Sequence, residues 1–284
     1  MLREASLPRT LPRTPEPSAT MGSPESVAAF DEQGACALLP IYHFNAMAVG
    51  SLAPAGAHIL DLGCGTGRFV AYLAARRPDL RITGLDLAPA MVRIGNEHIA
   101  RLGLTGRVRL IDGDMRAFRS LPLERANLVC SVFSLHHLSG GDDLRTCLSE
   151  IAALIGADQA LLWIFDHARP RRRRTAEEVP EIFTPDATAV FRNDSRNSLC
   201  ASWSFAELAA ALRETMPPAL HAARSRLLPL YQAHWLEPRV PTVPGEWVED
   251  ADLPPALRRE AQILRLLFRR TPITPTARRA RYWR

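Results

Sequence analysis

Short apolar runs alternate with amphipathic stretches through the middle of this 284-residue chain. Five of the runs are apolar enough to be buried on both faces, as parallel strands usually are. They span residues 57–62, 80–85, 108–111, 126–132 and 160–165. The stretches between them carry apolar residues at helical spacing, so the pattern predicts strands joined by crossover helices. The expected fold class is α/β, a doubly wound, Rossmann-like, mostly parallel sheet with helices on both faces.

Two helix starts support this pattern. Pro89 stands where a first-turn proline belongs, and Asp142 and Asp143 open a segment with apolar residues on one face. Residues 25–52 show irregular helical spacing interrupted by Gly34 and Pro40, which predicts two short helices forming an N-terminal cap or lid.

The flanking regions differ from this core in composition. Residues 1–24 are rich in proline and arginine and predict a mobile, disordered tail. The main domain should span 53–238, with a polar, loop-like insertion at about 170–200 that begins with an arginine run. Residues 239–284 form a Pro- and Arg-rich extension whose basic helix, 257–270, is expected to pack against the domain.

Composition is typical of a folded chain, with 47% hydrophobic and 23% charged residues and a net charge of +5. All 35 basic residues are arginine, a bias better explained by genome composition than by a phosphate-binding surface. The five cysteines form no Cys-x-x-Cys pair, so neither a zinc site nor any other metal site is expected. Without an apolar leader or membrane span, the expected location is the cytoplasm.

The first strand runs into a glycine-rich turn, Gly63-Cys64-Gly65-Thr66-Gly67, before a helix near Arg68. Glycine suits such a turn because it adopts unusual backbone angles and lets a ligand approach the main chain. A dinucleotide loop would place a third glycine where Arg68 stands, which disfavours a nicotinamide dehydrogenase.

Carboxylates follow the first three strands, and the carboxyl ends of parallel strands meet at one crevice. Asp61 precedes the first glycine and suits a cationic ligand group. Asp86 ends the second strand about twenty residues beyond the loop, where a carboxylate can accept hydrogen bonds from ribose hydroxyls. Asp114 is placed to accept from an adenine amino group, and Met115 to pack on the ring.

With these residues, the chain resembles the class I methyltransferase family, in its small-molecule branch, over roughly 58–165. The motifs are Asp61–Gly67, Asp86, Asp112–Met115 and Ser134-Leu135-His136-His137-Leu138. The resemblance implies S-adenosylmethionine as cofactor, and a methyltransferase domain at 53–238. It places the cofactor's methionine end near Asp61, Gly63, Cys64 and Gly65, the ribose near Asp86 and Leu87, adenine near Asp114 and Met115, and the sulfonium beside Ser131.

Two histidines after the fourth strand, His136 and His137, are the candidate catalytic bases, because an imidazole accepts a proton near neutral pH. Adjacent residues of a regular helix or strand do not face one pocket, so one of the two is expected to be structural. Asp166 and His167, which end the fifth strand, are candidates for orienting a substrate.

The predicted reaction is methyl transfer to a small-molecule acceptor by in-line displacement. One alternative is an RNA or protein methyltransferase, in which the run 171–174 would bind a polyanion. The tetrapeptide typical of nucleic-acid amino methylation is missing, because this position reads Ser131-Val132-Phe133-Ser134. Another alternative is a non-catalytic protein that binds S-adenosylmethionine.

Overall fold

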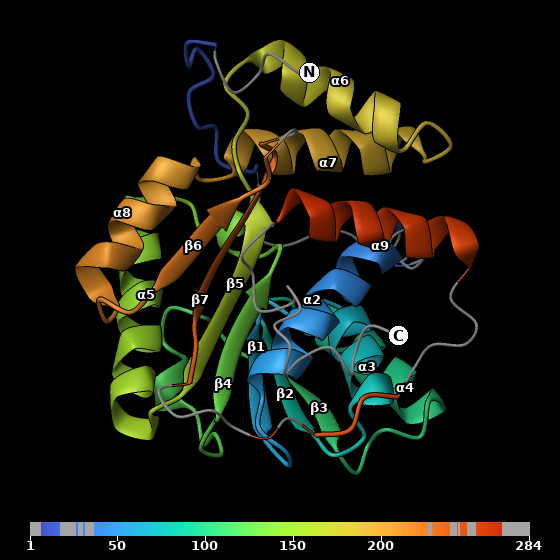
Figure 1. Ribbon diagram of the computed structural model, residues 1–284, viewed down its shortest axis with the longest axis vertical. Helices are drawn as coiled ribbons and strands as arrows, with labels where there is room; N and C mark the ends of the chain where they lie inside the picture. Colours follow the sequence, from blue (N-terminus) through green and yellow to red (C-terminus); the bar gives the residue numbers. More distant parts are fainter. Residues whose placement is uncertain are drawn as a thin grey trace.

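A computed structural model describes residues 7–17, 27, 31, 37–226, 229–238, 243, 245–248 and 254–268. Within these residues lies a seven-stranded sheet of order β3-β2-β1-β4-β5-β7-β6 (Figure 1). The strands are β1 (His58–Leu62), β2 (Arg81–Asp86), β3 (Val108–Asp112), β4 (Leu128–Val132), β5 (Leu161–His167), β6 (His221–Arg224) and β7 (Tyr231–Leu236). Neighbours among β1 to β5 pair in parallel, whereas β7 runs antiparallel to both β5 and β6.

Burial of both sheet faces explains the apolar runs that predicted the strands. Every residue of β1 and β4 is buried, as expected for central strands that are covered by helices on both sides. The predicted α/β, mostly parallel fold is therefore confirmed, with each predicted strand matched to within two residues at either end.

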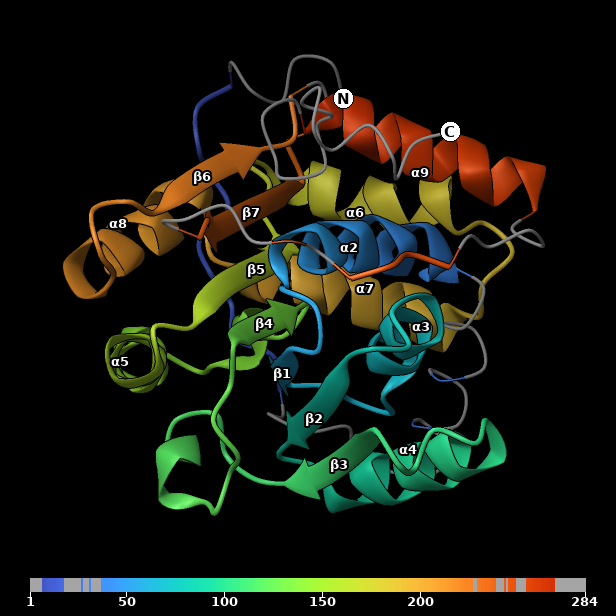
Figure 2. The same cartoon turned by 60° about the horizontal axis from the view of Figure 1, so that its bottom comes forward.

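Helices cover the two faces of the sheet (Figure 2). One face carries α2 (Leu39–Leu52), α3 (Arg68–Arg76) and α4 (Pro89–Arg101), and the other carries α5 (Gly141–Asp158) and α8 (Phe205–Thr215). Pro89 lies in the first turn of α4, and Asp142 and Asp143 lie in that of α5, as predicted. Two 3₁₀ turns complete the core, η2 (Phe118–Ser120) and η3 (Leu135–His137).

The segment predicted as a polar, loop-like insertion folds instead into two helices, α6 (Arg173–Phe183) and α7 (Ala189–Ala201). Both lie at the end of the sheet toward which β5 points (Figure 1). The loop prediction was wrong because each helix still buries apolar side chains on one side, such as Val179 in α6 and Phe191 in α7, although Ile182, Phe183 and Val190 are exposed. The insertion therefore forms a helical roof over the carboxyl ends of the strands.

The structure also changes the prediction for the N-terminal region. Pro40 does not interrupt a helix but stands in the first turn of α2, where its missing N–H costs nothing. The first of the two predicted short helices lies largely outside the described residues.

Residues 7–17, which we call the N-terminal strap, pack against the helical roof. Leu11 is 1% exposed, and the backbone N–H groups of Thr10 and Leu11 donate to the carbonyl of Arg171 at 2.8 and 2.9 Å. For these residues the prediction of a mobile tail was wrong. The rest of the predicted tail lies outside the described residues.

The basic C-terminal helix is α9 (Pro255–Leu267), and it packs on α2 as predicted. Phe268, which follows it, is buried 5.3 Å from the ring of Phe44 in α2, measured between ring centres. Among the described residues, no helix combines the length and the apolar character needed to cross a bilayer.

Candidate functional site

The glycine turn between β1 and α3 forms one wall of the site. Gly63 and Gly65 have φ angles of 74° and 55°, which side chains other than glycine rarely adopt. A Cβ at Gly63 would lie 1.7 Å from Ser134 Oγ, whereas one at Gly65 would meet no protein atom within 4 Å. Gly63 is thus required by packing, and Gly65 leaves its main chain open to the cavity.

Two buried carboxylates flank this turn. Asp86 Oδ2 accepts a hydrogen bond from Gly65 N at 2.7 Å, and its Oδ1 accepts one from Ala88 N at 2.9 Å. Asp61 Oδ1 accepts a weak bond from Cys130 Sγ at 3.3 Å. Burial disfavours charge and raises the pKa of both carboxyl groups, that of Asp61 to about 7. Two poorly hydrated carboxyl groups therefore flank the turn, and a cationic ligand bound there would favour their ionised forms.

A cavity of about 870 Å³ opens beside the turn, near the top of the range of roughly 300–1,000 Å³ typical of ligand pockets. The predicted site residues line it except Asp166 and Ser131. The side chain of Ser131 is buried in β4, and its Oγ finds no hydrogen-bond partner among the described residues. Asp114 reaches the cavity with its carboxylate already paired with Arg116, at 2.6 to 3.0 Å.

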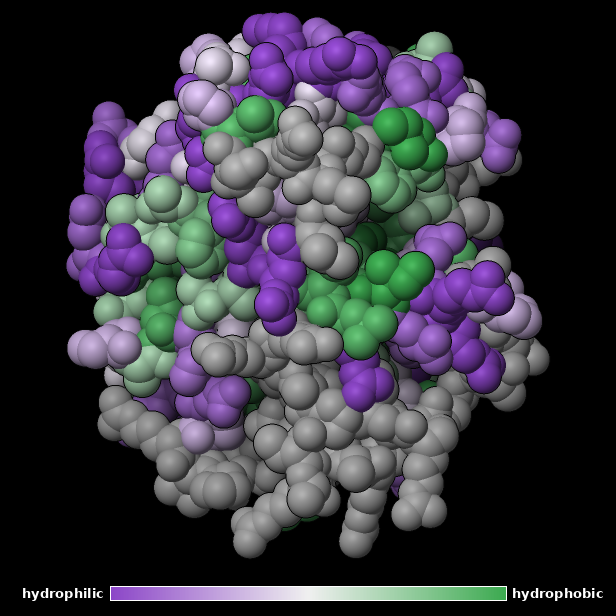
Figure 3. Space-filling model, turned by 45° about the horizontal axis from the view of Figure 1, so that its top comes forward, coloured by the Kyte–Doolittle hydropathy of each residue, from purple (hydrophilic) through white to green (hydrophobic). Residues whose placement is uncertain are grey.

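The far wall of the cavity is apolar and comes mostly from α2, the roof helices and α9. Its larger side chains include Tyr42, Phe133, Phe183, Phe191, Tyr231 and Leu264. Hydrophobic residues gather around a hollow on the face that α6, α7 and α9 share (Figure 3). An apolar molecule of moderate size could enter there and reach the glycine turn.

His136 and His137 both line the cavity, from the 3₁₀ turn η3. Their ring centres are 4.3 Å apart, although adjacent residues of a regular helix or strand would not face one pocket. Successive side chains of a 3₁₀ turn diverge by about 120°, so the turn alone does not bring the two rings together. Each ring instead has a carboxylate partner, Asp166 for His136 and Glu16 for His137. That one of the two histidines is structural stays a prediction.

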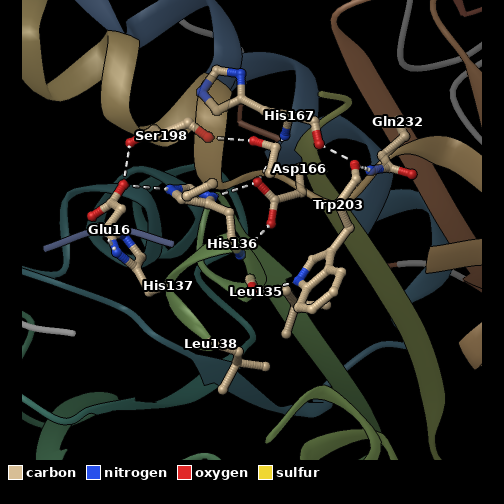
Figure 4. Close-up of polar contacts among 12 residues, drawn as sticks. Glu16, Leu135, His136, His137, Leu138, Asp166, His167, Ser198, Trp203 and Gln232 are labelled. Carbon is tan, nitrogen blue, oxygen red and sulfur yellow. Dashed lines mark hydrogen bonds and ion pairs between the residues drawn. The ribbon is translucent and has the colours of Figure 1, made fainter. Parts of the chain in front are cut away.

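Asp166 orients His136, as Figure 4 shows. Its Oδ1 lies 2.6 Å from His136 Nδ1, and its Oδ2 accepts from the backbone N–H of His136 at 3.1 Å. Burial alone would lower the pKa of His136, but the charge and hydrogen bond of Asp166 raise it on balance. Asp166 therefore contacts His136 and does not line the cavity where a substrate would lie.

Comparison with known proteins agrees with this geometry. Residues 59–157 match the family model described as a methyltransferase domain. Trans-aconitate 2-methyltransferase of Paracidovorax citrulli is 30% identical over 44% of this chain and 45% of its own length. An O-methyltransferase of Penicillium expansum is 32% identical over 47% and 48%. Residues 59–157 are therefore similar to methyltransferase domains. The chain spans a little under half the length of these two relatives.

Solved structures extend the likeness in fold. The plantazolicin methyltransferase BpumL, in complex with SAH, superposes with a TM-score of 0.57 over 76% of this chain and 90% of its own, at 13% identity. An O-methyltransferase family protein from Burkholderia thailandensis gives a TM-score of 0.53 over 74% and 59%, at 19% identity. The fold is therefore shared over about three quarters of the chain.

The N-terminal strap lies outside the matched residues 59–157, and its contacts with the site were missed in the sequence. Arg13 donates to the carbonyls of Ala201 and Ser139, each at 2.7 Å, and its guanidinium lies 3.8 Å from the centre of the Trp203 ring. Three residues farther on, Glu16 reaches the two histidines (Figure 4). Proline-rich composition hid these contacts, because both are made by polar side chains rather than by an apolar pattern.

Proposed function

We propose that the chain transfers the methyl group of S-adenosylmethionine to a small-molecule acceptor by in-line displacement. The observation that carries the proposal is that one cavity borders both parts of the site. The glycine turn with its carboxylates lines one side of this cavity, and the apolar wall lines the other. Displacement at a methyl group depends mainly on closeness and alignment of donor and acceptor. The SAH-bound neighbour and the small-molecule methyltransferases among the relatives favour the same reading.

The predicted residues would hold the cofactor as follows. Asp61, Gly63 and Gly65 would face its methionine end, with Cys64 packed behind the turn. Asp86 uses one lone pair of each oxygen for Gly65 and Ala88, and keeps the others for the ribose hydroxyls. Leu87 would lie beside the ribose, and Asp114 and Met115 would border the base. The cofactor supplies a methyl group already activated by a sulfonium.

The apolar wall favours an acceptor with a flat, apolar body. Phe133 has a φ of 56°, rare for an aromatic residue, and its ring stacks on His167 with 4.2 Å between centres. Burial, with the nearby charge of His136, lowers the pKa of His167 to about 3, so this imidazole is neutral and adds another flat ring to the wall. We place the loss of the acceptor's proton at the cluster of Glu16, His136 and His137.

The arginine run does not favour the RNA or protein alternative. Arg171 donates to the carbonyl of Leu7 in the strap at 2.8 Å, and Arg174 is paired with Glu178. These arginines serve contacts within the chain. A polyanion would have to displace these intramolecular contacts in order to bind the two side chains.

Turnover with a panel of acceptors tests the proposal. We expect S-adenosylhomocysteine to form from S-adenosylmethionine with apolar, ring-containing small molecules that carry a hydroxyl or amino group, at rates that change little with salt. Formation only with RNA or protein, falling steeply as salt rises, would favour the alternative instead. If the protein binds the cofactor but S-adenosylhomocysteine forms with none of these acceptors, the result would favour a non-catalytic binding protein.

The affinity for S-adenosylmethionine should rise with pH through neutrality. The pKa of Asp61 is about 7, so this group is mostly neutral at pH 6 and mostly ionised at pH 8, where it attracts the ammonium of the cofactor. One such ionisation predicts a Kd about tenfold lower at pH 8 than at pH 6. Calorimetric titration across this range measures it.

Asp61→Asn is the matched control, because it keeps the shape of the side chain and removes the ionisation. At pH 6 the Kd of Asp61→Asn for S-adenosylmethionine should be close to that of the wild type. At pH 8 it should be clearly higher than that of the wild type. Any change of Kd with pH that remains in this variant is assigned to Asp86, because burial also raises the pKa of that carboxyl group. An unchanged slope in Asp61→Asn would remove Asp61 from the cofactor site.

A further inference from the structure

Glu16, His136 and His137 bring three metal-ligating side chains to one wall of the cavity. Glu16 Oε2 lies 2.9 Å from His137 Nδ1, and Glu16 Oε1 lies 3.8 Å from His136 Nε2. The three ligand atoms all lie within 4.8 Å of one another. Zinc binds imidazole nitrogen and carboxylate oxygen at about 2.0–2.2 Å, which puts ligand atoms about 3–4 Å apart. Small side-chain shifts would bring this cluster to that spacing.

The neighbours of the cluster orient it as the neighbours of metal ligands do. Asp166 accepts from His136 Nδ1 at 2.6 Å, and the other ring nitrogen, Nε2, is the one that faces Glu16. A carboxylate on the far nitrogen is the usual partner of a metal-bound histidine, because it fixes the tautomer and increases the basicity of the ligand. Ser198 Oγ donates to Glu16 Oε1 at 2.8 Å and holds the third ligand (Figure 4).

A second observation comes from His137. Its Nδ1 is buried and, among the described residues, has no aligned hydrogen-bond partner, although Glu16 Oε2 is 2.9 Å away. Buried polar atoms are normally satisfied. A cation bound by both atoms would satisfy this nitrogen without requiring a hydrogen bond.

Charge balance points the same way. Glu16 and Asp166 are both buried against the cluster, and Asp194 of α7 lines the same part of the cavity. Three carboxyl groups therefore gather around two imidazoles at this wall of the cavity. A divalent cation bound between Glu16 and the imidazoles would place positive charge next to all three.

We propose that Glu16, His136 and His137 bind a divalent transition-metal cation of the zinc class, with the remaining coordination position open to the cavity. Two nitrogen ligands and one carboxylate suit Zn²⁺, whereas Mg²⁺ prefers oxygen ligands throughout. The strap contributes one of the three ligands, so cation binding also fastens the strap over the cavity.

The role of the cation in catalysis rests on the proposed function. An acceptor hydroxyl bound at the open position would lose its proton to solvent water more readily, because the cation stabilises the oxyanion. The new oxygen–carbon bond would then form as the sulfur–carbon bond breaks, giving S-adenosylhomocysteine and a methyl ether. The cation would thus take the place of a protein base.

Calorimetric titration of the untagged full chain with Zn²⁺, and separately with Mg²⁺, tests the site. We expect saturable binding of one Zn²⁺ per chain and no comparable binding of Mg²⁺. Glu16→Gln and His137→Ala should each weaken Zn²⁺ binding at least about tenfold. The matched control is His221→Ala, which removes an exposed histidine of β6 outside the cavity and should bind Zn²⁺ as the wild type does.

Titration of each variant with S-adenosylmethionine, in the same buffers, separates the two proposals. Retained cofactor binding shows that a variant is folded. Cofactor binding without saturable Zn²⁺ binding by the wild type, or Zn²⁺ binding that neither Glu16→Gln nor His137→Ala weakens, overturns the cation site and leaves the proposed function standing. Zn²⁺ binding that depends on these residues, without any methyl transfer, supports the site and counts against the function.

Discussion

Gly65→Ala should weaken binding of S-adenosylmethionine by at least about tenfold while the protein stays folded. A Cβ at this position meets no protein atom within 4 Å, so the added methyl group projects into the cavity that the cofactor would fill. Strain at the φ of 55° costs roughly 1 kcal/mol and affects folding rather than the cavity. Calorimetric titration gives the Kd, and thermal unfolding reports the strain.

Gly103→Ala is the matched control for that experiment. Gly103 has a φ of 68°, a Cβ there also meets no atom within 4 Å, and the residue does not line the cavity. The two variants should lose similar stability, and only Gly65→Ala should lose the cofactor. Equal cofactor affinity in both would mean that no ligand approaches the glycine turn.

Arg13→Ala should lower the free energy of unfolding by about 2–4 kcal/mol. The guanidinium donates to the carbonyls of Ala201, Ser139, His136 and Leu138 and stacks on the ring of Trp203. Its removal leaves partly buried acceptors unpaired, at about 1–3 kcal/mol for such a loss, and removes a cation–π contact of about 1 kcal/mol. Denaturant unfolding measures the total effect.

Arg93→Ala serves as the control for Arg13→Ala. Arg93 forms an exposed ion pair with Glu97 one helical turn away, a contact worth less than about 0.5 kcal/mol. Hydrogen exchange at the amides of Thr10 and Leu11 should accelerate in Arg13→Ala alone, because these amides hold the strap to Arg171. If Arg13→Ala unfolded like Arg93→Ala, the strap would not be a fastened part of the fold.

The parallel core was predictable because its signals are local. Continuous apolar runs marked β1 to β5, and the turn Gly63–Gly67 with Asp86 marked the crevice where their ends meet. The antiparallel edge was missed because β7 carries Gln232 and His234 in buried positions, and β6 is only four residues long. Gln232 is satisfied by the carbonyls of His167 and Trp203, and no local pattern reveals such partners.

The acceptor side was harder to predict, for a related reason. Pro180 and the arginine run obscured the helical character of α6. Glu16 lies 120 residues before His136, and only the folded chain shows that they meet. His136 and His137 were found as candidates, but their pairing with Asp166 and Glu16 depends on the turn η3, which the sequence pattern did not predict.

Calorimetric titration of the wild-type chain with S-adenosylmethionine, S-adenosylhomocysteine and a nicotinamide dinucleotide tests the central claim most directly. We predict saturable binding of the first two at one molecule per chain, and none of the dinucleotide. Failure of the folded protein to bind S-adenosylmethionine, or binding of the dinucleotide in its place, would contradict the assignment of the glycine turn and the function built on it.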